Sequence, residues 1–236
     1  MSPAGRALLH AFESGALARH PAFFLRAERL PLADVVAEQS YRPEFLKLAG
    51  AVPRLDGGVH AQGLVLLTKH KEENFANIAR GWALLAPGGT LVCSGANDDG
   101  AASLEKHVAK AFGPVQSLSK FHCRVFWFAK SEKAPPDYWR GLARLQPVAD
   151  GAWLSQPGVF SWDRIDDGSA LLAQHLPADL SGDIADFGCG WGYLSRTLLA
   201  RAPAIKKIDL IDAEQLALDA ARANVSDARA AFRSAD

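Results

Sequence analysis

The most constraining feature of this sequence is a glycine-rich turn between a predicted strand and a predicted helix. The strand covers residues 184–187, the turn runs from Gly188 to Gly192, and the helix follows over 193–200. Glycine lacks Cβ, so such a turn adopts unusual φ and ψ angles and lets a ligand lie against the backbone. The opening helix adds unpaired N–H groups and the positive end of its dipole. We therefore expect an α/β protein with a nucleotide-type ligand at this turn.

Two kinds of nucleotide ligand compete for the turn. A dinucleotide-binding turn has the form G-x-G-x-x-G, and Gly188 and Gly190 match its first two glycines. Tyr193 occupies the third glycine position, and the last glycine is Gly192 instead. The carboxylate of Asp186 would repel a pyrophosphate, whereas it suits the amino group and sulfonium of S-adenosylmethionine. The pattern favours S-adenosylmethionine over a nicotinamide dinucleotide, and a turn that binds nothing is the third alternative.

A second carboxylate, Asp212, ends the next predicted strand, 208–211. In that position it can accept hydrogen bonds from both ribose hydroxyls, which serves either cofactor. Cys189 lies inside the turn, and we expect a small filler rather than a nucleophile because no base is placed beside it. Trp191 and Tyr193 pack either over the ligand or into the sheet.

Two α/β units are predicted, over residues 1–133 and 153–236, with a polar, proline-bearing linker at 134–152. The strand–helix alternation of the first unit indicates a parallel sheet that ends in an antiparallel strand pair. Its helices are expected at 3–18, 43–49, 72–86 and 101–112, and its strands at 22–25, 63–67, 90–93, 115–118 and 124–128. The second unit is expected to have helices at 167–175, 193–200 and 213–224, and strands at 184–187, 208–211 and 230–233.

Composition excludes several classes of protein. The 26 Lys+Arg balance the 26 Asp+Glu, so no global basic field argues for nucleic acid. Residues 1–133 carry 16 Lys+Arg against 12 Asp+Glu, hence +4, and the remainder carries −4, so the first unit is the better candidate for a polyanion. Three scattered cysteines without a CxxC pair predict neither a disulfide framework nor a metal site. No apolar run reaches about 18 residues, so we expect no membrane partner and a cytoplasmic location.

The segment 158–172, with the sequence GVFSWDRIDDGSALL, extends the turn into a family resemblance. The D-x-G-C-G-x-G turn resembles motif I of class I methyltransferases. Together with the G-V-F-S…D-x-G-S-x-L-L run it resembles the ribosomal RNA guanine-N2 methyltransferases of the small-subunit methyltransferase C and large-subunit methyltransferase G group. In that family the segment caps the cofactor, and the matching positions are Phe160, Ser161, Asp166 and Ser169. The alternative is a loop followed by a helix with Asp166 or Asp167 as its N-cap.

The resemblance implies tandem Rossmann-like methyltransferase folds. The first would be a decayed domain for RNA recognition and folding support, because Lys69 and Lys71 stand where a working domain has its Asn-Pro-Pro turn. Lys69, Lys71, Lys120 and Arg124 are candidate phosphate contacts, with a solvated surface as the alternative. The second would be the first half of a domain that binds S-adenosyl-L-methionine. Its predicted cofactor residues are Phe160, Ser161, Asp166, Ser169, Asp186, Gly188, Cys189, Gly190, Gly192, Asp212 and, toward the adenine amine, Asp236.

The family's catalytic Asn-Pro-Pro-Phe/Tyr turn is missing from residues 1–236, and the Pro135-Pro136 pair lacks the Asn and lies in the linker. We therefore expect no catalytic residue in this chain and an incomplete second fold. It would have only strands 1–3 of the class I order 3-2-1-4-5-7-6, as in a fragment, with poor stability. The expected function of the parent protein is S-adenosylmethionine-dependent rRNA (guanine-N2) methylation, with ribosomal RNA or a ribosomal subunit as partner. A non-catalytic S-adenosylmethionine/RNA-binding or assembly module and a nicotinamide-dependent oxidoreductase are the alternatives.

Overall fold

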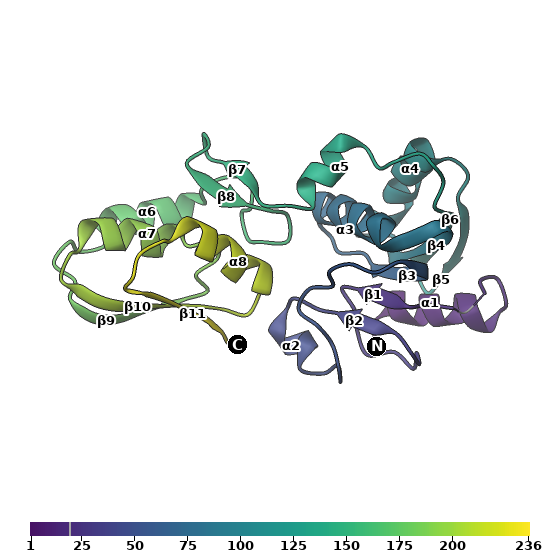
Figure 1. Cartoon of the computed structure of the whole chain (residues 1–236), viewed down its shortest axis with the longest axis horizontal. Helices are drawn as coiled ribbons and strands as arrows, with labels where there is room; N and C mark the ends of the chain where they lie inside the picture. The colour runs from purple at the N-terminus through teal and green to yellow at the C-terminus, as the bar shows by residue number, and fades with distance from the viewer. Residues whose placement is uncertain (19) are drawn as a thin grey trace. The chain divides into compact units, whose positions relative to one another are not determined.

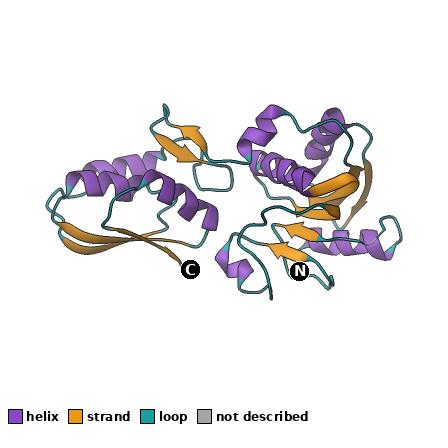
Figure 2. Ribbon diagram, viewed as in Figure 1, coloured by secondary structure: helices purple, strands orange, loops and turns teal. Residues whose placement is uncertain are grey.

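The computed structural model describes residues 1–18 and 20–236 and divides them into two compact units. Unit 1 comprises Met1–Ser40 and Glu44–Ala143, and unit 2 comprises Tyr41–Pro43 and Arg144–Asp236. Both are α/β, which confirms the predicted fold class (Figures 1 and 2). The range predicted as a linker contains helix α5 (Asp137–Leu142) and strand β7 (Gln146–Val148), so the chain is folded there.

Unit 1 contains a six-stranded sheet in the order β2-β1-β3-β4-β6-β5. The first four strands in this order are parallel, and β6 runs antiparallel to both β4 and β5. This is the predicted parallel sheet with an antiparallel pair at its end. The strands are β1 (Phe23–Leu25), β2 (Val36–Glu38), β3 (His60–Leu66), β4 (Leu85–Ala96), β5 (Gln116–Lys120) and β6 (Cys123–Ala129).

The helices of unit 1 cover both faces of this sheet. They are α1 (Pro3–Glu13), α2 (Arg42–Phe45, which straddles the two units), α3 (Lys71–Leu84), α4 (Ala101–Phe112) and α5. On one face, α1 packs Leu8 and Phe12 against Leu64 and Val125. On the other, rings of α3, α4 and β6 stack, with Trp82 and Phe112 centroids 4.4 Å apart. Burial on both faces explains the uninterrupted apolar run that predicted β3.

Helix α1 ends earlier than the prediction of 3–18. Ser2 begins the helix by accepting the Gly5 N–H on its Oγ at 3.0 Å. Gly15, at φ 73°, ends it in the left-handed conformation that glycine adopts readily after a helix. The prediction also missed β2, because three residues without an apolar run give no strand signal.

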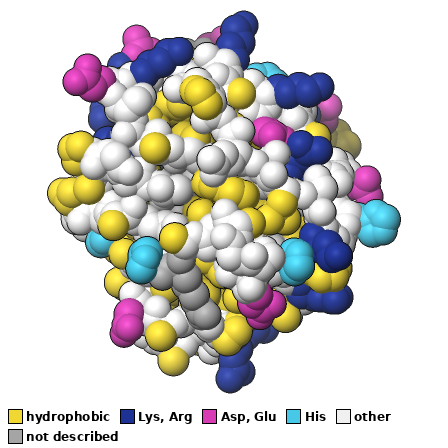
Figure 3. Space-filling model, turned by 90° about the vertical axis from the view of Figure 1, so that its right-hand side faces the viewer, with side chains coloured by type: hydrophobic (Ala, Val, Ile, Leu, Met, Phe, Trp, Pro, Cys, Tyr) yellow, Lys and Arg dark blue, Asp and Glu magenta, His cyan; other side chains and the backbone are white. Residues whose placement is uncertain are grey.

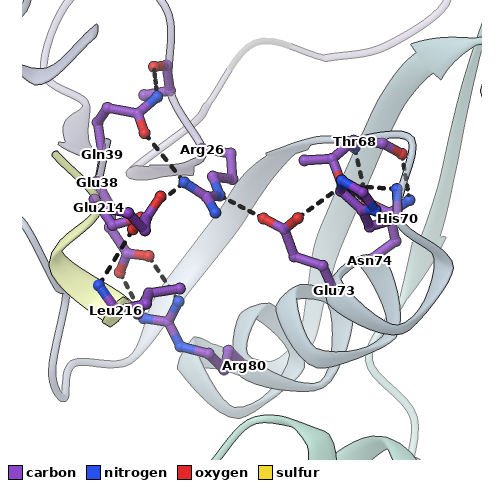
Figure 4. Close-up of polar contacts among 12 residues, drawn as sticks. Arg26, Glu38, Gln39, Thr68, His70, Glu73, Asn74, Arg80, Glu214 and Leu216 are labelled. Atoms are coloured by element: carbon purple, nitrogen blue, oxygen red, sulfur yellow. Dashed lines mark hydrogen bonds and ion pairs between the residues drawn. The ribbon is translucent and has the colours of Figure 1, made fainter. Parts of the chain in front are cut away.

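A polar network lies where β1, β2 and β3 end (Figure 4). Arg80 of α3 donates to both carboxylate oxygens of Glu38, at 2.6 and 2.5 Å. Arg26, directly after β1, donates from Nε to Glu73 at 2.6 Å, and Thr68, after β3, donates to the same carboxylate at 2.9 Å. The side chains of Glu38 and Glu73 are 6% and 4% exposed, so these ion pairs are removed from water.

Unit 2 contains a parallel three-stranded sheet in the order β11-β10-β9. Its strands are β9 (Gly182–Phe187), β10 (Ile205–Asp212) and β11 (Ala230–Ser234). Its helices are α6 (Asp167–His175), α7 (Tyr193–Arg201) and α8 (Gln215–Asn224), and a separate hairpin pairs β7 with β8 (Trp153–Ser155). Leu198 of α7 and Leu218 of α8 pack on Ile208 and Leu210 of the sheet.

The sequence run at 184–187 indicates a buried strand, and this interpretation of β9 was wrong for one face of the strand. Ile184 faces the core of unit 2, whereas Asp183, Ala185 and Phe187 are exposed, Phe187 to 79%. Alternate residues of a strand point to opposite faces, and among the described residues α7 and α8 pack on only one of them. The run Ile-Ala-Asp-Phe reads as buried because its outward residues are also apolar.

Leu210→Ala should destabilise unit 2 strongly, whereas Phe187→Ser should change little. Leu210 is 0% exposed, and a buried Leu→Ala change costs about 2–5 kcal/mol. A surface substitution stays within about 0.5 kcal/mol. Hydrogen exchange of β10 peptides measures the stability of unit 2 in both variants. Equal losses of protection in the two variants would contradict the one-sided burial of this sheet.

Glu38→Gln should destabilise unit 1 by about 3–5 kcal/mol, because it leaves the Arg80 guanidinium buried without its carboxylate. The matched control is Glu44→Gln, which breaks the exposed Glu44–Lys47 pair and should cost less than about 1 kcal/mol. The protection of β3 and β4 peptides against hydrogen exchange measures the stability of unit 1 in each variant. Similar protection in the two variants would show that the buried pair does not stabilise the sheet.

Candidate functional site

The candidate site begins at the turn between β9 and α7. Gly188, Gly190 and Gly192 have φ angles of 70°, 54° and 85°, all in the left-handed region that favours glycine. A Cβ on Gly188 or Gly190 would meet nothing within 4 Å, so these two glycines border open space. A Cβ on Gly192 would lie 2.8 Å from Val225, so this glycine lets the turn pack against the end of α8.

Three amide groups of the turn donate hydrogen bonds to β10, and a fourth, the Gly192 N–H, donates to the Cys189 carbonyl oxygen at 2.9 Å. The N–H groups of Gly188 and Cys189 both donate to the carbonyl oxygen of Ile211, at 2.8 and 3.1 Å. The Gly190 N–H donates to Oδ2 of Asp212 at 2.9 Å. A pyrophosphate site needs such amides to point at the ligand. Their engagement with β10 argues against a dinucleotide at this turn.

Asp186 lies in β9, two residues before Gly188, on the face toward α7. Its Oδ2 accepts a hydrogen bond from the Ser195 hydroxyl at 2.6 Å, and Ser195 is fully buried. Desolvation raises the pKa of Asp186, and the nearby charge of Asp212 raises it further, whereas the Ser195 hydrogen bond opposes both. The two carboxylates therefore form an acidic pair beside the turn.

Asp212 ends β10 and uses both carboxylate oxygens. Oδ2 accepts the Gly190 N–H, and Oδ1 accepts the Glu214 N–H at 2.8 Å, so the side chain is held rigidly beside the turn. Asp236 follows the end of β11 and is exposed, and the Ala235 N–H donates to the Asp212 carbonyl at 3.2 Å. Parallel pairing of β10 and β11 puts both acids at one edge of the sheet.

The upstream segment meets the turn in one small pocket of about 60 Å³. Its lining includes seven of the predicted site residues together with three further residues of the turn and α7. The predicted residues are Phe160, Ser161, Asp166, Ser169, Gly188, Cys189 and Gly190. The further residues are Trp191, Tyr193 and Leu194. Asp186, Gly192, Asp212 and Asp236 lie outside this lining.

Individual side chains of the upstream segment differ in exposure and partners. Phe160 is 74% exposed and available at the rim. Ser161 has a φ of 46°, an unusual conformation for a residue with a Cβ. Oδ2 of Asp166 accepts the Ser169 N–H at 2.8 Å and its hydroxyl at 3.1 Å, so Asp166 is the N-cap of α6. This capping role accounts for an aspartate at position 166 without a ligand. The Asp166 side chain also borders the pocket.

Cys189 is 7% exposed, and burial, followed by the charges of Asp212 and Asp186, raises the pKa of its thiol. The thiol stays protonated at neutral pH, which suits the predicted filler. Ser195 was not predicted as a site residue. Its only signal in the sequence is a hydroxyl side chain about one helical turn after Gly192. Trp191 is 5% exposed and meets Trp153 edge to face at 5.2 Å, so it packs inward while bordering the pocket.

The basic residues proposed for phosphate contacts differ in exposure and in their partners. Lys69, Lys71 and Lys120 are exposed, whereas Arg124 pairs with Glu105 at 2.5 Å. The face in Figure 3 has Lys and Arg side chains around its rim, interspersed with acidic and histidine side chains. Within residues 1–18 and 20–236, no group of three or more His, Cys, Asp or Glu could hold a metal ion. No described helix is long and apolar enough to cross a membrane.

Comparison with known proteins finds methyltransferases. Residues 151–235 match the model of the methyltransferase small domain. The chain is 34% identical over 213 residues to ribosomal RNA small subunit methyltransferase C of Pseudomonas aeruginosa strain LESB58, over 82% of this chain and 63% of that relative. It is 31% identical over 205 residues to the protein of the same name from Aeromonas hydrophila, over 84% of this chain and 56% of that relative.

Among solved structures, a 16S rRNA N2 methyltransferase from T. thermophilus in complex with AdoMet and guanosine aligns with a TM-score of 0.70 at 18% identity. The alignment covers 94% of this chain and 66% of that one, and it supports the fold. The chain spans less than two thirds of the length of these curated relatives. It is similar to the ribosomal RNA small subunit methyltransferase C proteins, and its residues 151–235 match the methyltransferase small domain.

Proposed function

We propose that this chain is the cofactor-binding part of an S-adenosylmethionine-dependent ribosomal RNA methyltransferase that modifies the exocyclic N2 of a guanine. The names of its relatives and the AdoMet and guanosine in the T. thermophilus complex support this assignment. The observation that carries it is the turn after β9, whose amides bind β10 while two carboxylates lie beside it. That environment favours a cationic sulfur nucleoside over a pyrophosphate.

Several of the predicted residues have a proposed role in holding the cofactor. Asp212 accepts the ribose hydroxyls, and Asp186 offsets the positive charge of the methionine part. Gly188 and Gly190 leave the open space that the nucleoside needs. Phe160 and its neighbours cap the ligand from the rim, and Asp236 contacts the adenine amine. S-adenosylmethionine would supply the methyl group: the N2 amine of an unstacked guanine would bond to the methyl carbon in line as the C–S bond breaks, and S-adenosylhomocysteine and one amine proton would be released.

We propose that unit 1 is itself a methyltransferase-like fold without a cofactor. Its strand order β2-β1-β3-β4-β6-β5 corresponds to the class I order without strand 3. Ligands of such sheets bind outside the carboxyl ends of the strands. In unit 1 this edge carries Arg26 and its ion pair with Glu73 instead of a glycine turn. The proposed roles that remain are contact with ribosomal RNA, through cations such as Lys69 and Lys120, and support of folding.

Unit 2 contributes β11-β10-β9, which corresponds to strands 3-2-1 of the same order. We propose, as the sequence implied, that this sheet is incomplete within residues 1–236 and that the domains divide near the 134–152 segment. No Asn-Pro-Pro-Phe/Tyr occurs in the chain, so a catalytic turn of that type would come from other residues. The chain alone is then expected to bind cofactor without transferring methyl.

A non-catalytic binding or assembly module is the second candidate, and the missing catalytic turn favours it for this chain. Calorimetry with S-adenosylmethionine and with a short rRNA hairpin separates the two kinds of binding. Methyl transfer to the hairpin by residues 1–236 would exclude this candidate. An NADH titration that saturates would favour the nicotinamide alternative instead.

Asp212→Asn should weaken S-adenosylmethionine binding about tenfold or more, because it replaces a charged acceptor of ribose hydroxyls by a neutral amide. Asp209→Asn is the matched control, since Asp209 lies in the same strand and points to the opposite face. Calorimetry should show an unchanged dissociation constant for the control. Equal affinities for both variants and the unsubstituted chain would remove Asp212 from the site.

The affinity for S-adenosylmethionine should fall on acidification at a pH above the ordinary Asp value of 3.8. Burial and Asp212 raise the pKa of Asp186, so this carboxylate is neutralised early and stops attracting the cation. The same raised pKa means that the Asp186 contribution to folding stability is greatest at low pH and falls as pH rises through the folded-state pKa.

Calorimetry between about pH 4 and pH 8 measures this dependence, because the range brackets the titration of a perturbed aspartate. Ser195→Ala removes the hydrogen bond that lowers the pKa and should move the midpoint upward, and Asp186→Asn should flatten the profile. S-adenosylhomocysteine lacks the sulfonium and should respond less. An identical profile for Asp186→Asn would assign the titration to another group.

A further inference from the structure

Asn224, the last residue of α8, joins three separate segments of unit 2. Its side chain is 8% exposed and makes three hydrogen bonds of 2.8 Å. Oδ1 accepts the Leu154 N–H, and Nδ2 donates to the carbonyl oxygens of Leu154 and Trp191. The carboxamide therefore ties β8 and the glycine turn to the same helix end.

Of the two tied segments, the glycine turn lines the pocket, and β8 leads along the chain to its rim. Trp191 lies in the glycine turn and lines the pocket directly. Leu154 lies in β8, and the chain leads from it through buried residues 155–157 and Val159, 6% exposed, to Phe160 at the rim. Asn224 lines no part of this pocket, so any effect on a ligand there passes through the backbone atoms it holds.

A second contact anchors the same hairpin to α7. Arg196 donates to the Ala152 carbonyl at 2.9 Å, and its guanidinium lies 4.1 Å from the ring centroid of Trp153. Arg196 is exposed, so its contribution is expected to be smaller than that of the buried Asn224. Both anchors act on the strand that leads into the rim.

We propose that Asn224 is a positioning residue of the cofactor site, which holds the 153–161 rim at a fixed distance from the glycine turn. The role rests on the proposed function, because it concerns the same pocket. Only a carboxamide combines an acceptor for the Leu154 N–H with two donors for two carbonyl groups. A carboxylate at this position would face both carbonyl oxygens without a proton to donate, so the rim and the turn would separate.

The test compares Asn224→Asp with Leu218→Ala in the whole chain. Leu218 is 0% exposed in the core of unit 2, so its truncation lowers stability without touching Leu154 or Trp191. Calorimetry should give Asn224→Asp an affinity for S-adenosylmethionine about tenfold lower, which corresponds to 1.4 kcal/mol, and leave Leu218→Ala within about twofold of the unsubstituted chain. Hydrogen exchange should speed up locally at the backbone of residues 154 and 190–192 in Asn224→Asp, whereas Leu218→Ala should speed it up across unit 2 without singling out these residues.

If Asn224→Asp does not fold, Arg196→Ala provides the test. Arg196 is exposed, so its contacts with Ala152 and Trp153 can be removed without leaving a cavity or an unpaired polar group in the core. Arg196→Ala should weaken binding about threefold, less than the tenfold expected for the buried anchor. Affinities of Asn224→Asp and Arg196→Ala equal to that of the unsubstituted chain would overturn the positioning role alone. An equal loss of affinity in Leu218→Ala would show that Asn224 affects binding only through the general stability of unit 2. Absence of binding by the unsubstituted chain would instead overturn the proposed function.

Discussion

The organisation of unit 2 depends on hydrogen bonds between the glycine turn and the end of β10. The Ile211 carbonyl oxygen accepts two amides of the turn, and the Asp212 carboxylate accepts a third. These bonds satisfy backbone groups that a tight turn would otherwise leave unpaired. They also fix the acid that ends β10 beside the open space at Gly188 and Gly190. One set of contacts thus shapes the turn and holds a carboxylate beside it.

The two units differ in the residues that follow the carboxyl ends of their parallel strands. In unit 1, Arg26 follows β1 in a left-handed conformation, with φ 52°, and its guanidinium pairs with the buried Glu73. In unit 2, glycines follow β9 and leave space that no side chain of the turn fills. In unit 1, buried ion pairs occupy the carboxyl edge of the sheet. In unit 2, two acidic side chains and the glycines of the turn leave open space at the corresponding edge. The two edges thus differ in residue size and in charge, at the position where ligands of parallel sheets bind.

Sequence periodicity located most of the regular structure, and its failures have physical causes. Helix α4 was predicted at its observed bounds because its apolar spacing is clear and glycines flank it. Strands β2, β7 and β8 have three residues each, too few for any period to show. Two of the outward residues of β9, Ala185 and Phe187, are apolar, so alternation could not reveal that one face is exposed. Helix α5 follows two prolines, which signalled a break in structure rather than the start of a helix.

The sequence by itself determined that a strand, a glycine turn and a helix follow one another, with acids at two strand ends, because local spacing and glycine chemistry are properties of neighbouring residues. It also singled out Phe160 and Asp166, through their resemblance to a family. Only the tertiary structure decided that the turn amides bind Ile211 and Asp212 and that Ser195 holds Asp186. It also decided that Asn224 joins the rim to the turn. Such contacts join residues far apart in the chain, and the packing of α7 and α8 on the sheet selects them.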